Sequence, residues 1–162
     1  MSSNAVDARA LRDAFGAFAT GVTVITTRDA AGTDWGLTAN SFSSVSLDPP
    51  LLSWCLGNAS DCFAGFEEAS HFAVHVLRAD QEALSATFAR KGADKFAGLA
   101  LERGPAGIPL LSEYLARFVC RVAGRYPAGD HVIFLGEILD FQIGEGEPLL
   151  FHRGRYGRLA AP

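Results

Sequence analysis

The sequence predicts a mainly β fold with some α-helix: an antiparallel sheet, closed as a barrel, with helices packed on its outside. About six short segments have strand-like composition, and turns join most of them. Regular alternation of strands and helices is missing, which argues against a doubly wound parallel sheet. The 162 residues contain no repeat, low-complexity tract or linker, so we expect a single domain over residues 1–162, with about residues 1–8 disordered.

Composition limits the partners of such a domain. The apolar fraction is 49% and the charged fraction 20%, as in ordered globular proteins. A net charge of −4 disfavours binding to nucleic acid and to anionic membranes, because the overall field repels phosphate. A phosphate-bearing ligand would therefore need a local basic group.

The cysteines and the N-terminus predict a cytoplasmic protein. The three cysteines are odd in number and lack CxxC spacing, so neither a disulfide framework nor a zinc ribbon is expected. The N-terminus shows no cationic segment followed by an apolar one, as a secretory signal would. No apolar run approaches the roughly 20 residues that span a bilayer.

The N-terminal segment, residues 7–19, is predicted to be a short amphipathic helix. Its apolar residues at i, i+4 and i+7 share one face: Leu11, Phe15 and Phe18. Asp7 could cap the start of the helix, and Gly21 could follow its end.

Three strands are expected next, at residues 22–27, 35–47 and 51–56. A turn at residues 29–34 should bring the second strand back antiparallel to the first. That second segment has no uniformly apolar face, so we expect it to break into a loop near Asn40. The sequence Asp-Pro-Pro at 48–50 should stop pairing, because proline lacks the backbone donor.

The second half of the chain alternates helices, strands and turns less regularly. Residues 60–68, capped by Ser60, and residues 80–89 predict helices. Strands are expected at 72–77, 117–124, 131–143 and 149–152. Turns or loops are expected between them, at 92–98, 104–109, 125–130 and 144–148.

A run of small polar residues between strand-like segments is the first candidate for function. It comprises Thr38, Asn40, Ser41, Ser43, Ser44 and Ser46. These hydroxyl and amide groups could form a binding wall for one polar ligand. They could equally be a polar edge strand followed by a turn, and the residues alone leave both interpretations open.

Standard catalytic signatures are absent. There is no GxxxxGK[ST] phosphate loop, no GxGxxG after a strand and no GxSxG elbow. His71 and His75 have the spacing of a helical metal pair, but they flank a strand and lack the HExxH context. They are better interpreted as two half-buried strand histidines, so no metal site is predicted. Cys55 lies in an apolar run with no adjacent base, which favours inert packing.

Two further groups could contact a ligand. The sequence Phe88-Ala-Arg-Lys91, with Lys95 beyond it, is either a solvated helix end or a phosphate contact. Asp130 could hold the imidazole of His131, which opens a strand and could contact a ligand ring. The basic tail at residues 152–158 is too short and isolated to indicate nucleic-acid binding.

Short motifs occur in order along nearly the whole chain: Phe18-Ala-Thr-Gly-Val22, Gly36-Leu-Thr-Ala-Asn-Ser-Phe42, Ser46-Leu-Asp-Pro-Pro-Leu51, Phe72-Ala-Val-His-Val-Leu77, Phe88-Ala89 with Asp94-Lys-Phe96, Gly129-Asp-His131 and Gly154-Arg-Tyr-Gly157. Together they resemble the short-chain flavin reductase family, the reductase components of two-component flavin-dependent monooxygenases. Each motif is weak alone, but their order and intervals are specific. His75 departs from the pattern, because many relatives carry asparagine there.

The resemblance implies an FMN-binding split-barrel fold, a homodimer with the flavin near the subunit interface, and a set of ligand contacts. The ribityl chain and phosphate would contact Thr38, Ala39, Asn40 and Ser41. The isoalloxazine ring would lie beside Ser53, Trp54 and Cys55, mainly along their backbone. Phosphate would bind Ser60 at a helix N-terminus and lie under Phe88, Ala89, Arg90 and Lys91. His131 would lie on the nicotinamide side.

The implied activity is hydride transfer from NADH or NADPH to FMN or FAD, with reduced flavin released to a partner monooxygenase. Such a reaction needs positioning rather than a catalytic acid or nucleophile, so no catalytic residue is assigned. One alternative is a flavin-binding module for storage or redox sensing, without turnover. Another, within the same fold class, is an oxidase of the pyridoxamine-phosphate type.

Overall fold

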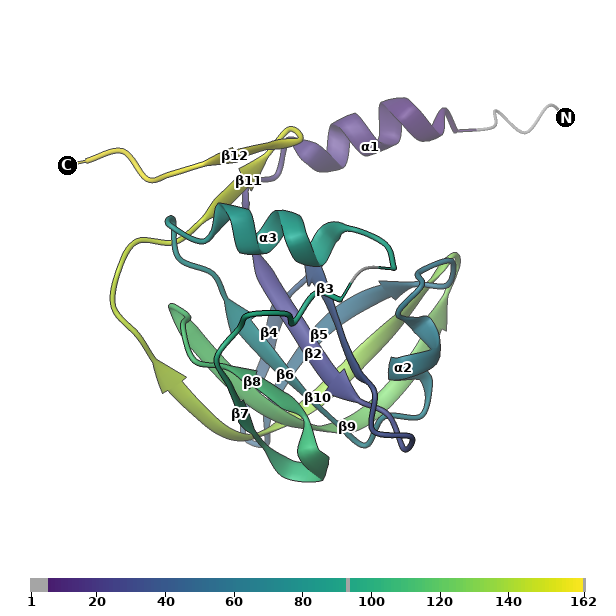
Figure 1. The fold of residues 1–162 in the computed structure, drawn as a ribbon. Helices are drawn as coiled ribbons and strands as arrows, with labels where there is room; N and C mark the ends of the chain where they lie inside the picture. Colours follow the sequence, from purple (N-terminus) through teal and green to yellow (C-terminus); the bar gives the residue numbers. More distant parts are fainter. Residues whose placement is uncertain (1–5, 93, 162) are drawn as a thin grey trace, which may run out of the picture.

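A seven-stranded antiparallel sheet forms the body of the protein in the computed structural model, which describes residues 6–92 and 94–161 (Figure 1). Its strand order is β3-β2-β6-β9-β10-β5-β4, and every pairing in it is antiparallel. This confirms a mainly β, antiparallel fold with few helices. Of the expected N-terminal disorder at about residues 1–8, positions 1–5 lie outside the described residues. Within the described part of the chain, no helix is long and apolar enough to cross a membrane.

The elements follow one another along the chain as Figure 1 labels them. The strands of the large sheet are β2 (Thr23–Arg28), β3 (Asp34–Ala39), β4 (Ser43–Leu47), β5 (Pro50–Gly57), β6 (His71–Val76), β9 (Ala116–Ala128) and β10 (His131–Ile143). The smaller strands are β1 (Thr20–Gly21), β7 (Leu101–Arg103), β8 (Pro109–Leu111), β11 (Leu150–His152) and β12 (Arg155–Gly157). The helices are α1 (Ala8–Gly16), α2 (Phe63–Glu67), α3 (Glu82–Ala89) and the 3₁₀ turn η1 (Pro105–Gly107).

An aromatic cluster fills the space inside the curved sheet. The ring of Trp54 stacks on Phe134 at 4.8 Å and meets Phe66 and Phe72 edge-on, at 5.1 and 5.8 Å between centroids. None of the four side chains is more than 1% exposed. Large rings in offset and edge-to-face contact contribute strongly to core stability, so this cluster fixes the backbone of β5.

Helix α3 packs closely against β3. A Cβ atom at Gly36 would lie only 2.6 Å from the Phe88 ring, so the close approach requires glycine at this position. Phe88 itself is fully buried and meets Phe96 edge-on at 5.1 Å. One turn earlier, the Thr38 hydroxyl donates to the carbonyl of Ser85 at 2.6 Å. The start of the polar segment is thereby fixed beneath the helix.

The N-terminal helix is shorter than predicted. The Asp7 carboxylate accepts from the backbone N–H groups of Arg9 and Ala10, which confirms the expected cap. However, α1 ends at Gly16, so Phe18 lies beyond it, and Gly21 belongs to β1 rather than to a helix end. No residue of α1 is buried, and the helix stands away from the sheet (Figure 1).

The predicted interruption of pairing at the Asp-Pro-Pro sequence is found, but it covers only two residues. Leu47 pairs with Pro50, so Asp48 and Pro49 form the turn of a hairpin between β4 and β5, and pairing resumes at once. Proline is compatible with the first residue of a strand, where its missing donor does not interrupt the ladder.

Other strand boundaries also differ from those predicted. The expected loop at 104–109 contains only η1 between the short strands β7 and β8, and the expected connection at 125–130 is strand as far as Ala128. The tail at 152–158 contains β12, which pairs with β11.

Ser60 is not the N-cap of α2. The helix begins at Phe63, and Cys62 occupies the cap position without a side-chain cap bond. The Ser60 hydroxyl instead accepts from the Cys62 N–H at 3.2 Å, in the turn before the helix. With five residues, α2 is a single turn and offers little helix dipole to an anion.

Candidate functional site

The polar segment after β3 is fixed to β5 by Ser41. Its hydroxyl accepts from the backbone N–H of Cys55 at 2.9 Å and lies 3.3 Å from the Cys55 carbonyl, to which it can donate. This contact brings the two predicted stretches together, residues 38–41 and residues 53–55. It leaves Asn40, at the break between β3 and β4, exposed to solvent.

Side chains alternate between the two faces of β5, so its three predicted ligand contacts do not share one face. Ser53 and Cys55 are half-buried on one face of the strand, whereas Trp54 points inward and is fully buried. A ligand beside this strand can therefore reach Trp54 only through its backbone. Burial raises the pKa of the Cys55 thiol, so this residue is a neutral part of the wall and not a thiolate.

The turn after β5 connects Ser60 to the end of α3. The carboxylate of Asp61, next to Ser60, accepts from the backbone N–H of Gly92 at 2.7 Å. This hydrogen bond, with a smaller contribution from the nearby Lys95 ammonium, holds the pKa of Asp61 below its usual value. Ser60 is next to Asp61 in the chain, and Lys91 is next to Gly92. The Asp61–Gly92 hydrogen bond therefore joins the segments that contain Ser60 and Lys91, which are far apart in sequence.

The predicted basic cluster at the end of α3 separates into exposed and buried residues. Ala89, Arg90 and Lys91 are exposed, while the Phe88 side chain belongs to the core beneath α3. Lys95 was grouped with the exposed cations from sequence, but only 8% of it is exposed. Its ammonium group donates to backbone carbonyls inside the protein, so only Arg90 and Lys91 present charge to a ligand here.

His131 opens β10 beside the end of β5. Its Nδ1 lies 2.7 Å from the Asp130 carboxylate, as the sequence suggested, and this hydrogen bond lowers the pKa of Asp130. The Asn58 N–H donates to the Asp130 carbonyl at 2.9 Å, which fixes the turn against the strand end. About half of the His131 side chain is exposed, and a Cβ atom at Gly57 would lie 3.7 Å from its Nε2.

The other histidine of interest, His75, is structural. It is fully buried rather than half-buried: Nδ1 lies 3.0 Å from the Val24 carbonyl, and Nε2 accepts from the Leu111 N–H at 3.0 Å. Both ring nitrogens are therefore occupied, with the neutral ring donating through Nδ1. Burial lowers the pKa of His75 to about 3. Among residues 6–92 and 94–161, no group of three or more His, Cys, Asp or Glu could hold a metal ion.

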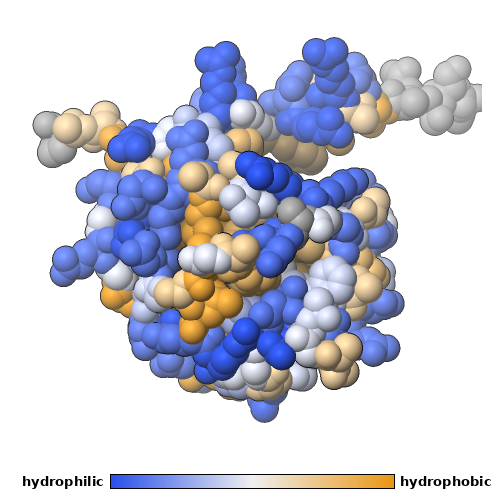
Figure 2. Space-filling view, in the orientation of Figure 1, coloured by the Kyte–Doolittle hydropathy of each residue, from blue (hydrophilic) through white to orange (hydrophobic). Residues whose placement is uncertain are grey.

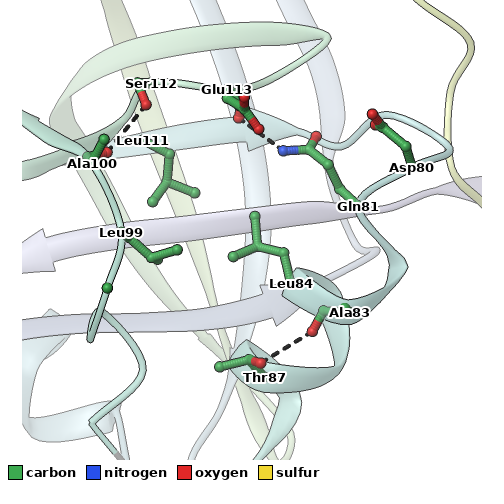
Figure 3. A pocket seen from close by; sticks show the side chains of 11 residues that line it. Asp80, Gln81, Ala83, Leu84, Thr87, Leu99, Ala100, Leu111, Ser112 and Glu113 are labelled. Atoms are coloured by element: carbon green, nitrogen blue, oxygen red, sulfur yellow. Dashed lines mark hydrogen bonds between the residues drawn. The ribbon is translucent and has the colours of Figure 1, made fainter.

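A cavity of about 490 Å³ lies beside α3 but is lined by none of the predicted site residues (Figure 3). Its apolar part is Leu84, Leu99 and Leu111, and Figure 2 shows apolar surface gathered below α3 on this face. Its rim carries Asp80 and Glu113, both paired with Arg78. Among the described residues that line it there is no lysine or arginine, unlike at the end of α3, so a phosphate ligand fits the cavity poorly.

The residues around Asn40 and Lys91 offer exposed polar groups together with the cationic groups that the cavity beside α3 lacks. Peptide groups along residues 38–41 and 53–55, with the hydroxyls of Thr38, Ser41 and Ser53, offer hydrogen-bonding groups along an extended surface. Arg90 and Lys91 supply the local positive charge that the net negative chain requires for phosphate. Fold and site together define an antiparallel β protein with exposed polar and cationic groups at the end of its sheet.

Comparison with known proteins identifies the family. The family model described as "Flavin reductase like domain" matches residues 15–160. "FMN reductase (NADH) SmoA" of Agrobacterium fabrum is 47% identical over 154 residues, which are 95% of this chain and 87% of that protein. The reductase subunit HsaB of a flavin-dependent monooxygenase from Rhodococcus jostii is 38% identical over 157 residues, 96% of this chain and 80% of HsaB. The chain therefore belongs to the flavin reductase family.

A solved structure supports the same assignment. The NADH:FAD oxidoreductase SgcE6 of Streptomyces globisporus superimposes with a TM-score of 0.90 at 38% identity, over 99% of this chain and 98% of SgcE6. SgcE6 has also been solved with NAD and FAD fragments. Some other relatives are longer, and this chain spans about half of their length. The resemblance read from the sequence is confirmed, together with the class of activity and the cofactors, flavin and a nicotinamide nucleotide.

Proposed function

We propose that this protein reduces FMN or FAD with NADH or NADPH and supplies the reduced flavin to a separate monooxygenase. The membership of the chain in the flavin reductase family carries the proposal. The names of relatives such as HsaB add the link to a monooxygenase. The site agrees with this activity, because it offers hydrogen-bonding groups along an extended surface.

The proposed flavin site runs across the polar end of the sheet. Polar and backbone groups of Thr38, Ala39, Asn40 and Ser41 hold the ribityl chain, and the backbone of Ser53, Trp54 and Cys55 lines the ring. Ser60, Ala89, Arg90, Lys91 and the backbone of Phe88 surround the phosphate. Two hydrogen bonds support this assignment, because they bring these distant segments together: the Cys55 N–H donates to the Ser41 hydroxyl, and the Gly92 N–H donates to the Asp61 carboxylate.

Flavin supplies the hydride-accepting chemistry when it is bound, and the protein supplies orientation. His131 lies at the opposite end of β5 from the β4 hairpin, where its ring and Asp130 can orient the nicotinamide nucleotide. The half-buried wall around Cys55 keeps water from one side of the reacting rings. Holding the two rings at reacting distance is the main contribution to rate that such a site can make.

We also propose that the protein is a homodimer with a split-barrel fold. Several large apolar side chains are exposed at the sheet edge and on the N-terminal segment, among them Leu47 (97%), Ile143 (80%) and Phe18 (78%). β4 is an edge strand, and β10 continues past the last residue that pairs with β5, Glu137. A second copy of the chain would cover this surface.

Light scattering on the purified protein tests the dimer. The native chain should have twice the mass of one chain, and Leu47→Asp should shift it toward the monomer. Leu159→Asp, at another exposed leucine outside the sheet, is the control. A native monomer would contradict the proposed assembly.

The three free cysteines are compatible with the reducing cytoplasm that we propose as the location.

The activity itself is tested by following NADH or NADPH absorbance with and without added FMN or FAD. Oxidation of the nucleotide that depends on flavin is the expected result. Flavin binding without nucleotide loss would instead identify a storage or sensing module. Conversion of pyridoxamine phosphate to its aldehyde would identify the oxidase. Kinetics with both flavins and both nucleotides determine which pair is preferred.

A further inference from the structure

Lys95 is a buried cation whose role the flavin contacts do not explain. Only 8% of the residue is exposed, and no carboxylate among the described residues lies within ion-pair distance of its ammonium group. Burial of an unpaired ammonium is unfavourable unless its donors are hydrogen-bonded.

The three acceptors of Lys95 belong to three different segments. Its Nζ donates to the carbonyl of Gly36 in β3 at 3.0 Å and to the carbonyl of Phe88 near the end of α3 at 3.3 Å. The third contact is the Cys62 thiol, at 3.8 Å, at the start of α2. A cation at the C-terminal carbonyls of a helix is also favoured by the helix dipole. The ammonium group therefore ties α3 to the segments on either side of it.

A second tether acts on the same turn. The Asp61 carboxylate accepts from the Gly92 N–H, so the chain leaving α3 is held at Phe88 by Lys95 and at Gly92 by Asp61. The exposed residues Ala89, Arg90 and Lys91 lie between these two fixed points. Their backbone has little freedom, although their side chains reach solvent.

We propose that Lys95 and Asp61 are positioning residues for the phosphate end of the flavin, acting through the Ala89–Lys91 turn without touching the ligand. The inference rests on the flavin site proposed above. Preorganising the turn lowers the entropy lost when Arg90 and Lys91 engage phosphate, and so strengthens binding of phosphorylated flavins selectively.

The neighbouring cavity does not provide a direct role for Lys95. A space of about 360 Å³ is lined by Lys95 and by three carboxylates, those of Asp34, Asp61 and Asp94. Phosphate in that space would face more negative than positive charge. Lys95 therefore acts on phosphate through the turn and not as a ligand inside this cavity.

The test compares FMN with riboflavin, which has the same ring and ribityl chain but no phosphate. The quantity measured is the ratio of kcat/KM for FMN to kcat/KM for riboflavin, with the nucleotide saturating. Asp61→Ala, which removes the acceptor of the Gly92 N–H, should lower this ratio about tenfold, the usual effect of losing one charge-assisted hydrogen bond. The loss should be in the KM for FMN, with kcat retained.

Asp61→Asn is the matched control at the same position. It removes the charge but keeps an oxygen that can accept from Gly92, so the FMN preference should be retained or rise, because a negative charge near phosphate is lost. If Asp61→Asn and Asp61→Ala change the ratio equally, charge and not positioning determines the preference, and the proposal is wrong.

Lys95→Met extends the test to the buried cation. It should lower the FMN preference at least as much as Asp61→Ala, while the KM for riboflavin stays within twofold. If Lys95→Met does not fold, the two Asp61 variants still decide the question. Equal loss for FMN and riboflavin would assign Lys95 a purely structural role.

The native protein separates this proposal from the proposed function. If it reduces neither flavin, the proposed function is wrong. If it reduces FMN and riboflavin equally well, the phosphate end of the flavin is not bound at this turn.

Discussion

The predicted site consists of two layers with opposite properties. The inner layer, Trp54, Phe88 and Lys95, is buried and makes all its contacts within the protein. The outer layer includes Asn40 and Lys91, which are exposed. Asn40 directly follows β3, and Lys91 lies between Phe88 and Lys95 in the chain. Buried and exposed residues alternate along a strand, and exposed residues follow buried Phe88 at the end of α3. Residues of the two layers are therefore neighbours in sequence. Substitutions of the inner aromatic residues should therefore change stability. Lys95 should act on the ligand through the turn above it, and outer substitutions should change ligand parameters directly.

The largest effect should come from Trp54, at the centre of the aromatic cluster. Trp54→Ala leaves a large cavity among Phe66, Phe72 and Phe134, and should lower the free energy of unfolding by about 3–5 kcal/mol. Chemical denaturation measures the loss. Tyr126→Ala, at a 54% exposed aromatic residue, should change it by well under half as much. Similar losses for the two variants would contradict the assignment of Trp54 to the inner layer.

The next effect is an acid sensitivity that comes from His75. The folded protein holds this ring neutral, with a pKa of about 3, against an ordinary value of 6.5. Below pH 6.5 the unfolded chain takes up a proton that the folded chain excludes, so stability present above pH 6.5 is lost as the pH falls toward 3. Between pH 7 and pH 5 this one group should lower the free energy of unfolding by about 2 kcal/mol.

His75→Asn is the matched variant. Asparagine does not titrate, so the stability difference between the native protein and the variant should shift by about 2 kcal/mol between pH 7 and pH 5. Denaturation of both proteins at the two pH values measures this shift, and contributions from the other histidines cancel in the difference. A pH-independent difference would show that His75 gains no proton on unfolding in this range.

Asn40 tests the outer layer. Asn40→Ala removes an exposed amide from the polar segment and should weaken flavin binding about three- to tenfold, as expected for one hydrogen bond, with the unfolding transition unchanged. Quenching of flavin fluorescence on titration gives the dissociation constant. Thr87→Ala, whose hydroxyl bonds within α3 at the separate cavity, should leave flavin affinity unaltered. Unaltered affinity in Asn40→Ala would remove this residue from the site.

Much of the fold followed from local patterns in the sequence. β-branched and alternating segments located β2, β5, β6 and β10 to within one or two residues, because each carries its own apolar pattern. The polar break at Asn40 was also predicted, since neither face of residues 35–47 was uniformly apolar. The three-residue strands β7 and β8 were missed, because such short strands depend on tertiary pairing and have little pattern of their own.

The layers of the site were harder to read from the sequence. One amphipathic stretch contains Phe88, Arg90, Lys91 and Lys95. Only the packing of α3 on Gly36 shows which of these residues are buried. Lysine is rarely buried, so no local signal separates Lys95 from Lys91. Local sequence likewise could not reveal the Asp61–Gly92 hydrogen bond just before α2, because it joins residues 31 positions apart.

The smallest effect, and the one that separates the two ligands, should come from His131. Its exposed ring, oriented by Asp130, is proposed to contact the nicotinamide nucleotide and not the flavin. His131→Ala should raise the apparent KM for NADH or NADPH a few-fold, because one partly exposed contact contributes about 1 kcal/mol or less, and should change the flavin dissociation constant less. Steady-state kinetics at saturating flavin, with flavin titration as the internal control, measure both. His131 belongs to the outer layer, which contacts ligand and does not support the core, so the variant should unfold like the native protein. An unchanged KM for the nucleotide would mean that His131 faces solvent only.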